Sequence, residues 1–183
     1  MKSVCVFCGS RHGTDARYAE AARQTGEMMA RNHWRLVYGA GDVGLMGEVA
    51  RAAQTANGPT MGIIPIHLMK REVGKRDLTQ LVVTEDMHER KKVMFMNSDA
   101  IVVLPGGAGS LDEFFEVLTW RQIGLHQKPI YLLNTANYWA TLMQLLNHVV
   151  QSGFAEQSMV DSVTVVETPA DLELALLEAF QTA

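Results

Sequence analysis

Seven short segments rich in β-branched residues recur along the chain, and longer helical patterns separate them. The segments Ala100–Leu104 and Pro129–Leu133 are apolar almost without interruption. A strand with such a sequence must be covered on both faces, as in a parallel sheet with helices on either side. The predicted strands are Ser3–Phe7, Arg35–Tyr38, Thr60–Ile64, Leu81–Thr84, Ala100–Leu104, Pro129–Leu133 and Ser162–Val166.

The intervening stretches carry helical periodicity, and the last of them opens with Thr168 and Pro169, a favourable cap and first-turn residue. Strands that alternate with helices predict an α/β fold with a Rossmann-like, doubly wound parallel sheet, in one domain spanning residues 1–183. Residues 65–80 are expected to form a surface loop with a short helix. The predicted helices are Asp15–Arg31, Leu45–Thr55, Asp86–Asn97, Leu111–Ile123, Tyr138–Gln151 and Pro169–Phe180.

Three of the predicted strands end in turns that contain glycine. These turns are Cys8-Gly9-Ser10, Gly39–Gly44 with Gly41 inside it, and Pro105–Ser110 with Gly106, Gly107 and Gly109. Glycine lets backbone N–H groups approach a ligand closely, and the N-terminus of the following helix attracts anions. One such turn would indicate no more than a change of chain direction. Three at the carboxyl edge of one sheet predict a phosphate-binding site.

The second turn, Gly39–Gly44, matches the Gly-x-Gly-x-x-Gly pattern of dinucleotide-binding proteins. The match follows the second strand rather than the first. The next strand runs into Ile63–His67, without the acidic residue that would bind a ribose hydroxyl. NAD binding is therefore disfavoured, and the chain contains no Gly-x-x-x-x-Gly-Lys-Ser/Thr loop for a nucleoside triphosphate.

The third turn is followed by a serine and two acids. Ser110 is expected at the N-cap of the next helix, where its hydroxyl can cap the helix or bind a phosphate oxygen. Asp112 and Glu113 are expected in the first turn, where the helix dipole favours anions. Stabilising the helix would explain Asp112 completely. Glu113 should face whatever the loop holds, and Glu116 could share its face.

The predicted helix from Asp86 carries three consecutive bases. Asp86 and Glu89 have the spacing of a capping pair, and Lys92 fits a solvated face. Met87 and Arg90 lie three residues apart on one helix face, at the same sheet edge as the glycine turns. An arginine in that position can make bidentate contacts to phosphate.

Pro105–Glu113 resembles the Pro-Gly-Gly-x-Gly-Thr-x-x-Glu signature of the Lonely Guy phosphoribohydrolases, many of which were once labelled lysine decarboxylases. The resemblance extends over nearly the whole chain. It also rests on residues Val6–Ser10, Tyr38–Gly41, Gly44–Gly47, Gly62–Pro65, Met87–Lys91 and Trp120–Pro129. Three departures stand out: Ala40 replaces a glycine, Ser110 replaces a threonine, and Arg11-His12 occupy positions where small residues are common.

The resemblance implies hydrolysis of the N-glycosidic bond of an N6-modified adenosine 5′-monophosphate, giving a free cytokinin base and ribose 5-phosphate. It also implies a homodimer that needs no cofactor and no metal. Glu113 would stabilise the ribosyl cation, and Arg90 would hold the phosphate or polarise the leaving base. Residues expected to bind substrate are Gly9, Ser10, Gly39, Gly41, Met87, Arg90, Lys91, Gly106, Gly107, Gly109, Ser110 and Glu116. His88 and His126 are expected to be structural.

Composition disfavours several other classes of partner. The formal net charge of −4 gives no sign of nucleic-acid binding. No apolar run approaches the roughly 20 residues that would span a bilayer, and the N-terminal segment is typical of a strand rather than a secretory signal. A cytoplasmic protein is therefore expected. Cys5 and Cys8 form a Cys-x-x-Cys pair, but strand alternation should point them to opposite faces, which disfavours redox or metal chemistry.

Two other functions compete with this one. A pyridoxal phosphate decarboxylase would need a lysine in a Schiff-base context, and no lysine has one. A nucleotide-sensing module without turnover would need only the loops, whereas a carboxylate such as Glu113 beside a bound phosphate favours an enzyme. The expected homodimer would be buried partly through the helices Asp86–Asn97 and Leu111–Ile123, which carry an unusual apolar load: Met94, Phe95, Phe114, Phe115 and Trp120.

Overall fold

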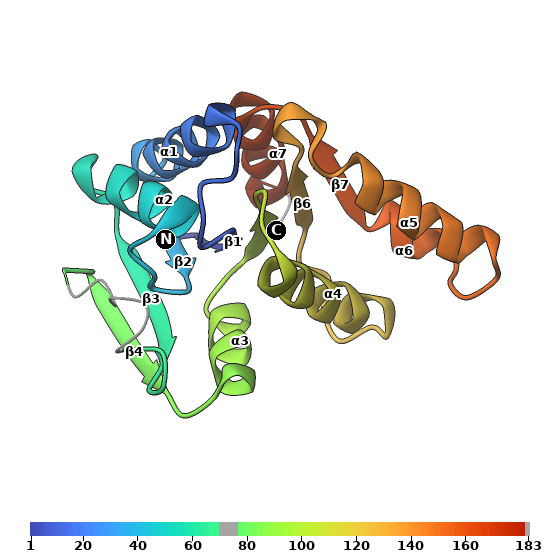
Figure 1. Cartoon of the computed structure of the whole chain (residues 1–183), viewed down its shortest axis with the longest axis horizontal. Coiled ribbons are helices and arrows are strands. Elements are labelled where there is room, and N and C mark those ends of the chain that lie inside the picture. Colours follow the sequence, from blue (N-terminus) through green and yellow to red (C-terminus); the bar gives the residue numbers. More distant parts are fainter. Residues whose placement is uncertain (70–76, 182–183) are drawn as a thin grey trace.

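A single parallel sheet of seven strands forms the centre of the molecule, in the order β4-β3-β2-β1-β5-β6-β7 (Figure 1). The structure is a computed structural model, and it describes residues 1–69 and 77–181. Every predicted strand is confirmed, with ends displaced by no more than one residue. The strands are β1 Ser3–Phe7, β2 Arg35–Tyr38, β3 Thr60–Pro65, β4 Gln80–Thr84, β5 Ala100–Val103, β6 Ile130–Leu133 and β7 Val163–Val166.

Seven α-helices connect or follow these strands within the described residues. The helices are α1 Ala16–Arg31, α2 Gly44–Thr55, α3 Met87–Met96, α4 Ala108–Gln122, α5 Ala140–Gln151, α6 Gln157–Asp161 and α7 Pro169–Gln181, with a 3-10 turn at Thr135–Asn137. Helix α6 was not predicted. Part of the expected loop at 65–80, residues 70–76, lies outside the described residues, and its two end residues belong to β3 and β4.

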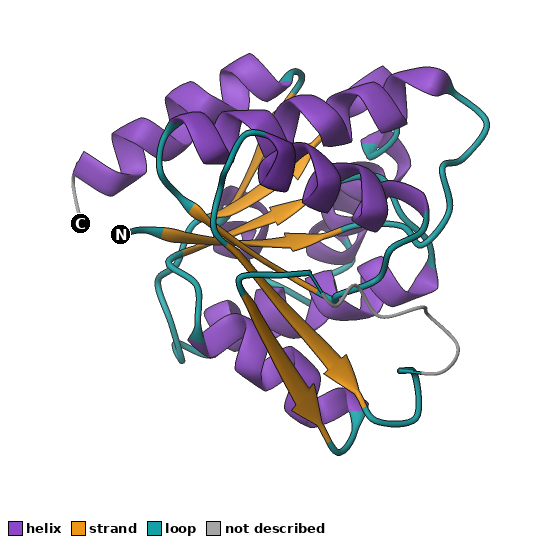
Figure 2. Cartoon of the chain, turned by 90° about the vertical axis from the view of Figure 1, so that its left-hand side faces the viewer, coloured by secondary structure: helices purple, strands orange, loops and turns teal. Residues whose placement is uncertain are grey.

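The helices cover both faces of the sheet, as the continuously apolar strands predict (Figure 2). Helices α1, α2 and α7 pack with Val4 and Val6 on one face. Helices α3, α4, α5 and α6 pack with Cys5 and Phe7 on the other. Alternate residues of β1 therefore point into two separate cores, and the expected doubly wound α/β fold is confirmed.

The chain reverses its direction across the sheet at β1. Strands β1 to β4 add outward on one side, after which the chain returns through α3 and places β5 beside β1. Because the right-handed crossover rule holds on both sides, the connecting helices change face at this point. The loops after β1 and β5 consequently diverge, and a crevice opens at the carboxyl ends of these strands. One hydrogen bond, from Gly9 N to Pro105 O at 3.0 Å, joins the two loops.

Candidate active site

A cavity of about 500 Å³ lies at this reversal point, within the range of small-molecule sites. All three glycine turns contribute to its wall, together with α3 and α4. The predicted site residues that line it are Gly9, Ser10, Gly39, Met87, Arg90, Gly106, Gly107, Gly109, Ser110 and Glu113. Gly41, Lys91 and Glu116 lie outside the described lining.

Helix α4 begins earlier than expected. Its N-cap is Gly107, so Ser110 is the third helical residue and not the N-cap, and Asp112 and Glu113 lie in the second turn and not the first. Glycine is an acceptable N-cap, and Gly107 has no side chain with which to bond the first-turn amides. The unsatisfied N–H groups at this helix end, which lies at the cavity wall, are therefore available to a ligand.

The first N–H groups of α2 already have a hydrogen-bond acceptor within the protein. The amides of Leu45 and Met46 lie 3.0 and 3.4 Å from the carbonyl oxygen of Gly9, which accepts from both. Gly44 adopts a φ of 60°, and a Cβ there would lie 2.2 Å from the carbonyl carbon of Ser10. The second glycine turn therefore packs against the loop after β1. Of these two helix ends at the cavity, that of α4 is the one open to an anion.

Arg90 is buried at 5% exposure and held by main-chain oxygens. Its Nε donates to Ile63 O at 3.1 Å, and its Nη2 donates to Gly39 O at 2.6 Å. A Cβ on Gly39 would lie 2.0 Å from the same Nη2, so glycine is required there to admit the guanidinium. Met87 Sδ lies 3.7 Å from Nη1 on the same helix face, as the spacing predicts. Arg90 is thus a fixed positive charge in the cavity wall.

Glu113 and Arg90 both act on the thiol of Cys8, which also lines the cavity. Burial raises the pKa of Cys8 well above its ordinary value; the negative charge of Glu113 raises it further, and the positive charge of Arg90 lowers it. Both charges are therefore close enough to this side of the cavity to influence the same atom. The thiol itself is protonated at neutral pH and is not a nucleophile.

Lys91 belongs to a separate ion-pair group behind the cavity wall. Its Nζ lies 2.9 Å from Asp112 Oδ2 and 3.1 Å from Glu116 Oε2. Burial lowers the pKa of Lys91, but the hydrogen bonds to the two carboxylates outweigh burial and leave the pKa raised. These residues tie α3 to α4. Lys91 and Glu116 thus brace α3 against α4, and neither is among the described residues that line the cavity.

Sequence reasoning did not single out several residues that line the cavity. Tyr18 and Tyr138 form an aromatic wall, with ring centroids 5.5 Å apart in an edge-to-face arrangement. Met46 and Leu68 add apolar surface. Aromatic and apolar side chains suit a purine-like base. Of these residues, Met46 lies within the Gly44–Gly47 motif, and the others are marked by no local motif in the sequence.

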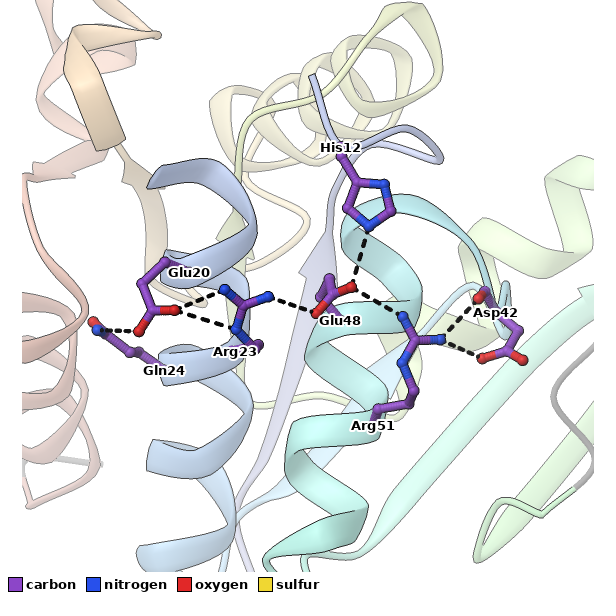
Figure 3. A network of polar contacts seen from close by, with 7 residues as sticks. All are labelled: His12, Glu20, Arg23, Gln24, Asp42, Glu48 and Arg51. Atoms are coloured by element: carbon purple, nitrogen blue, oxygen red, sulfur yellow. Dashed lines mark hydrogen bonds and ion pairs between the residues drawn. The ribbon is translucent and has the colours of Figure 1, made fainter. Parts of the chain in front are cut away.

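Arg11 and His12 also line the cavity, and His12 anchors the loop after β1 to a polar network (Figure 3). Glu48 of α2 is the centre of that network. It lies 3.1 Å from His12 Nε2, and it accepts from Arg23 at 2.9 Å and Arg51 at 3.1 Å. Burial raises the pKa of Glu48, but these three hydrogen bonds outweigh it and hold the pKa below its ordinary value. The cavity rim is therefore tied to α1 and α2 through one carboxylate.

Ala40, where the resembling family has glycine, is buried and has a φ of 59°. This left-handed conformation is disfavoured for residues with a Cβ. The methyl group is accommodated because Gly62 stands opposite; a Cβ on Gly62 would lie 2.7 Å from that of Ala40. The fold therefore accommodates alanine in place of glycine at position 40, with strain confined to the left-handed backbone of that residue.

The two histidines singled out from the sequence lie away from the cavity lining. His126 is buried, with Nε2 2.9 Å from Val117 O and Nδ1 accepting from Lys128 N at 3.1 Å. Burial lowers the pKa of His126, which keeps the ring neutral. His88 is exposed on α3 and is not among the described lining residues.

Cys5 and Cys8 are both free and buried. They belong to the two different cores, as alternation predicts. Among residues 1–69 and 77–181, no group of three or more His, Cys, Asp or Glu side chains is placed to hold a metal ion. In the same part of the chain, no helix has the length and apolar character required to cross a bilayer.

Residues 46–176 match the family model described as possible lysine decarboxylase. A protein of Rhodococcoides fascians named cytokinin riboside 5′-monophosphate phosphoribohydrolase is 45% identical over 84% of the chain and 78% of its own length. The Arabidopsis thaliana enzyme of the same name, LOG5, is 41% identical over 86% of the chain and 69% of its own length. A probable rice enzyme, LOGL2 of Oryza sativa subsp. japonica, is 40% identical over 94% and 70%.

Solved structures with lower sequence identity share the fold. The Moco carrier protein from Chlamydomonas reinhardtii superimposes with a TM-score of 0.76 at 19% identity, covering 100% of this chain and 99% of its own. The molybdenum cofactor binding protein from Rippkaea orientalis gives 0.71 at 22% identity, covering 98% of both chains.

Proposed function

The chain belongs to the family described as possible lysine decarboxylase, which includes relatives named as cytokinin riboside 5′-monophosphate phosphoribohydrolases, and we propose that it is such a phosphoribohydrolase. Its substrate is an N6-modified adenosine 5′-monophosphate, and its products are the free base and ribose 5-phosphate. The observation that carries this proposal is a carboxylate, Glu113, in the same cavity wall as an open helix N-terminus.

The 5′-phosphate binds at the N-terminus of α4. A Cβ on Gly107 or Gly109 would meet no described heavy atom within 4 Å, so the backbone there is open to a ligand. The N–H groups of this first turn and the Ser110 hydroxyl donate to phosphate oxygens, and the helix dipole adds attraction. The second glycine turn, Gly39–Gly44, serves instead to admit Arg90 at Gly39 and to pack against the loop after β1 at Gly44.

Glu113 stabilises the ribosyl cation and orients the attacking water. As the C1′–N bond breaks, both of its electrons leave with the base, and C1′ acquires oxocarbenium character. The water oxygen then bonds to C1′; of the two protons of that water, one stays on the new hydroxyl and the other compensates the charge of the departing base. Arg90, whose guanidinium is fixed by two carbonyl groups, supplies positive charge to the leaving base or the phosphate.

The two competing functions receive less support. No lysine occurs among the described residues that line the cavity, so a Schiff base with pyridoxal phosphate has no candidate there. A nucleotide sensor would gain nothing from placing the Glu113 carboxylate beside a phosphate site, because like charges repel.

The decisive test compares Glu113→Gln with Asp112→Asn. Both changes replace an acid by its amide on α4, but Asp112 pairs with Lys91 outside the described lining. Release of base from N6-prenylated adenosine monophosphate should fall about 10²–10³-fold in Glu113→Gln and stay near the wild-type rate in Asp112→Asn. Binding of ribose 5-phosphate should change little in either variant. Normal turnover by Glu113→Gln would assign catalysis to another group.

The substrate range gives an independent check on the phosphate site. Monophosphates should be hydrolysed, whereas free nucleosides and triphosphates should be poor substrates, because one open helix end suits one phosphate. Equal rates with adenosine and adenosine monophosphate would contradict the assignment of the phosphate site.

The protein is proposed to act as a cytoplasmic homodimer. Two buried free thiols suit a reducing compartment. Of the apolar residues expected at the interface, Met94 and Phe114 belong to the protein's own core, and Phe95 packs against Trp120. The exposed apolar side chains that support the proposal are Met96, Phe115, Ile123 and Leu125, on α3, α4 and the turn after α4. A monomeric mass at micromolar concentration would refute the homodimer.

A further inference from the structure

The phenol of Tyr138 joins two loops that are distant in sequence. Its hydroxyl donates to the carbonyl oxygen of Gly106 at 2.6 Å, across a separation of 32 residues. Both residues line the cavity. Tyr138 precedes α5 and comes from the loop after β6, whereas Gly106 belongs to the glycine turn before α4. The contact therefore attaches the proposed phosphate loop to a neighbouring part of the fold.

The loop that presents Tyr138 is held in an unfavourable backbone conformation. Ala136 and Asn137 have φ values of 56° and 60°, and two successive left-handed non-glycine residues are costly. The side chain of Asn134 secures the turn: its Oδ1 accepts from Trp139 N at 2.8 Å, and its Nδ2 donates to the Glu167 carboxylate at 3.1 Å. Asn134 thus holds the strained turn in place, and the turn sets the position of Tyr138.

The ring of Tyr138 is fixed as well. It packs edge-on against Trp139, with centroids 4.7 Å apart, and against Tyr18, with centroids 5.5 Å apart. Its hydroxyl consequently has a defined position before any ligand arrives. A donor held in this way can orient the group that accepts from it.

The Tyr138 hydroxyl gives the Gly106–Gly107 peptide an attachment outside its own turn. Glycine is the residue with the greatest backbone freedom, and no described atom would contact a Cβ on Gly107. A peptide unit is planar and trans, so its C=O and N–H point in opposite directions. By holding the oxygen of Gly106, Tyr138 also sets the direction in which the Gly107 N–H points. The preceding carbonyl, of Pro105, is held by Gly9 N at 3.0 Å.

We propose that Tyr138 is a positioning residue for phosphate recognition: its hydroxyl fixes the Gly106–Gly107 peptide so that the Gly107 N–H donates to the substrate phosphate. The inference rests on the proposed function, because it takes the phosphate site to be at the start of α4. The base and the reacting bond are not touched by this hydrogen bond. Its loss should therefore affect binding of the phosphate more than the chemical step.

The test compares Tyr138→Phe with Tyr131→Phe. The Tyr131 hydroxyl also donates to a main-chain oxygen, that of Ala175 at 3.1 Å, but it does so outside the described cavity lining. Calorimetry with ribose 5-phosphate should show affinity reduced about threefold to tenfold in Tyr138→Phe and unchanged in Tyr131→Phe. With N6-prenylated adenosine monophosphate, KM should rise by the same factor while kcat stays within about twofold, as expected for lost ground-state binding.

The remaining outcomes each decide the question. Equal affinity of wild type and Tyr138→Phe for ribose 5-phosphate would overturn the positioning role and leave the proposed hydrolase intact. An equal loss of affinity in Tyr131→Phe would also overturn it, because a general structural effect would then suffice. A wild-type protein that neither binds ribose 5-phosphate nor releases base would overturn the proposed function together with this inference.

Discussion

Replacing Ala40 by glycine should be nearly neutral for stability, although a buried methyl group is lost. The left-handed φ of 59° costs an alanine roughly 1–2 kcal/mol, and glycine removes that cost. Two losses oppose this gain. Removing the buried methyl group costs about 0.8 kcal/mol, and the greater freedom of glycine in the unfolded chain costs roughly 0.4–1 kcal/mol. The net change in the free energy of unfolding is then between about −0.8 and +0.8 kcal/mol.

Ala100 provides the matched control. Like Ala40, it is fully buried, at 0% exposure, but it lies in strand β5 and does not have a positive φ. Ala100→Gly loses the same methyl group and gains the same unfolded-state freedom with no strain to relieve, so it should cost roughly 1.2–1.8 kcal/mol. Urea titrations of the two variants and the wild type measure the difference. Equal destabilisation by the two substitutions would refute the assignment of strain to Ala40.

Three further variants probe the cavity wall and the core. Gly39→Ala should lower the free energy of unfolding by about 3 kcal/mol or more, because its Cβ would displace the Arg90 guanidinium from two main-chain oxygens. Gly107→Ala, where the Cβ meets no described atom, should change the free energy of unfolding by no more than about 0.5 kcal/mol. Urea titrations measure both values. Equal effects of the two changes would show that Arg90 can move at little cost. Burial and the charge of Glu113 raise the pKa of Cys5 and Cys8 in the folded protein, so the unfolded chain loses these two protons at a lower pH. The free energy of unfolding should therefore fall as pH rises above about 8.5, by up to about 1.4 kcal/mol per pH unit for each thiol. The double change Cys5→Ala/Cys8→Ala should flatten this slope between pH 8.5 and 10, and an unchanged slope would assign the loss of stability to other groups.

The fold could be predicted from the sequence because its strands are apolar on both faces and short glycine turns end them. Where a boundary was wrong, a local feature explains the error. Helix α4 begins at Ala108 because Gly107 serves as its N-cap, although Ser110 is the stronger capping residue by type. Helix α6 has only five residues, Gln157–Asp161, too few to establish a helical period.

The site was predictable only where chemistry follows from consecutive residues. The glycine turns, Arg90 and Glu113 are brought to one cavity because parallel strands end at the same edge. The role of Lys91 was not readable, because its partners Asp112 and Glu116 are placed by the packing of α4 against α3. Tyr138 was missed for the same reason, since its acceptor lies 32 residues away and belongs to another loop.

The strand order also divides the cavity between two halves of the chain. Residues 1–97 contain β1 to β4 with Arg90, and residues 98–183 contain β5 to β7 with Glu113. Each half holds only neighbouring strands, and the halves meet in the sheet along the β1–β5 seam. Two polypeptides cut at this point would each lack half of the binding wall. Substrate would therefore bind the reassembled pair in preference to either fragment, and its binding would stabilise the association of the two fragments. Release of base would then report how much of the pair has reassembled.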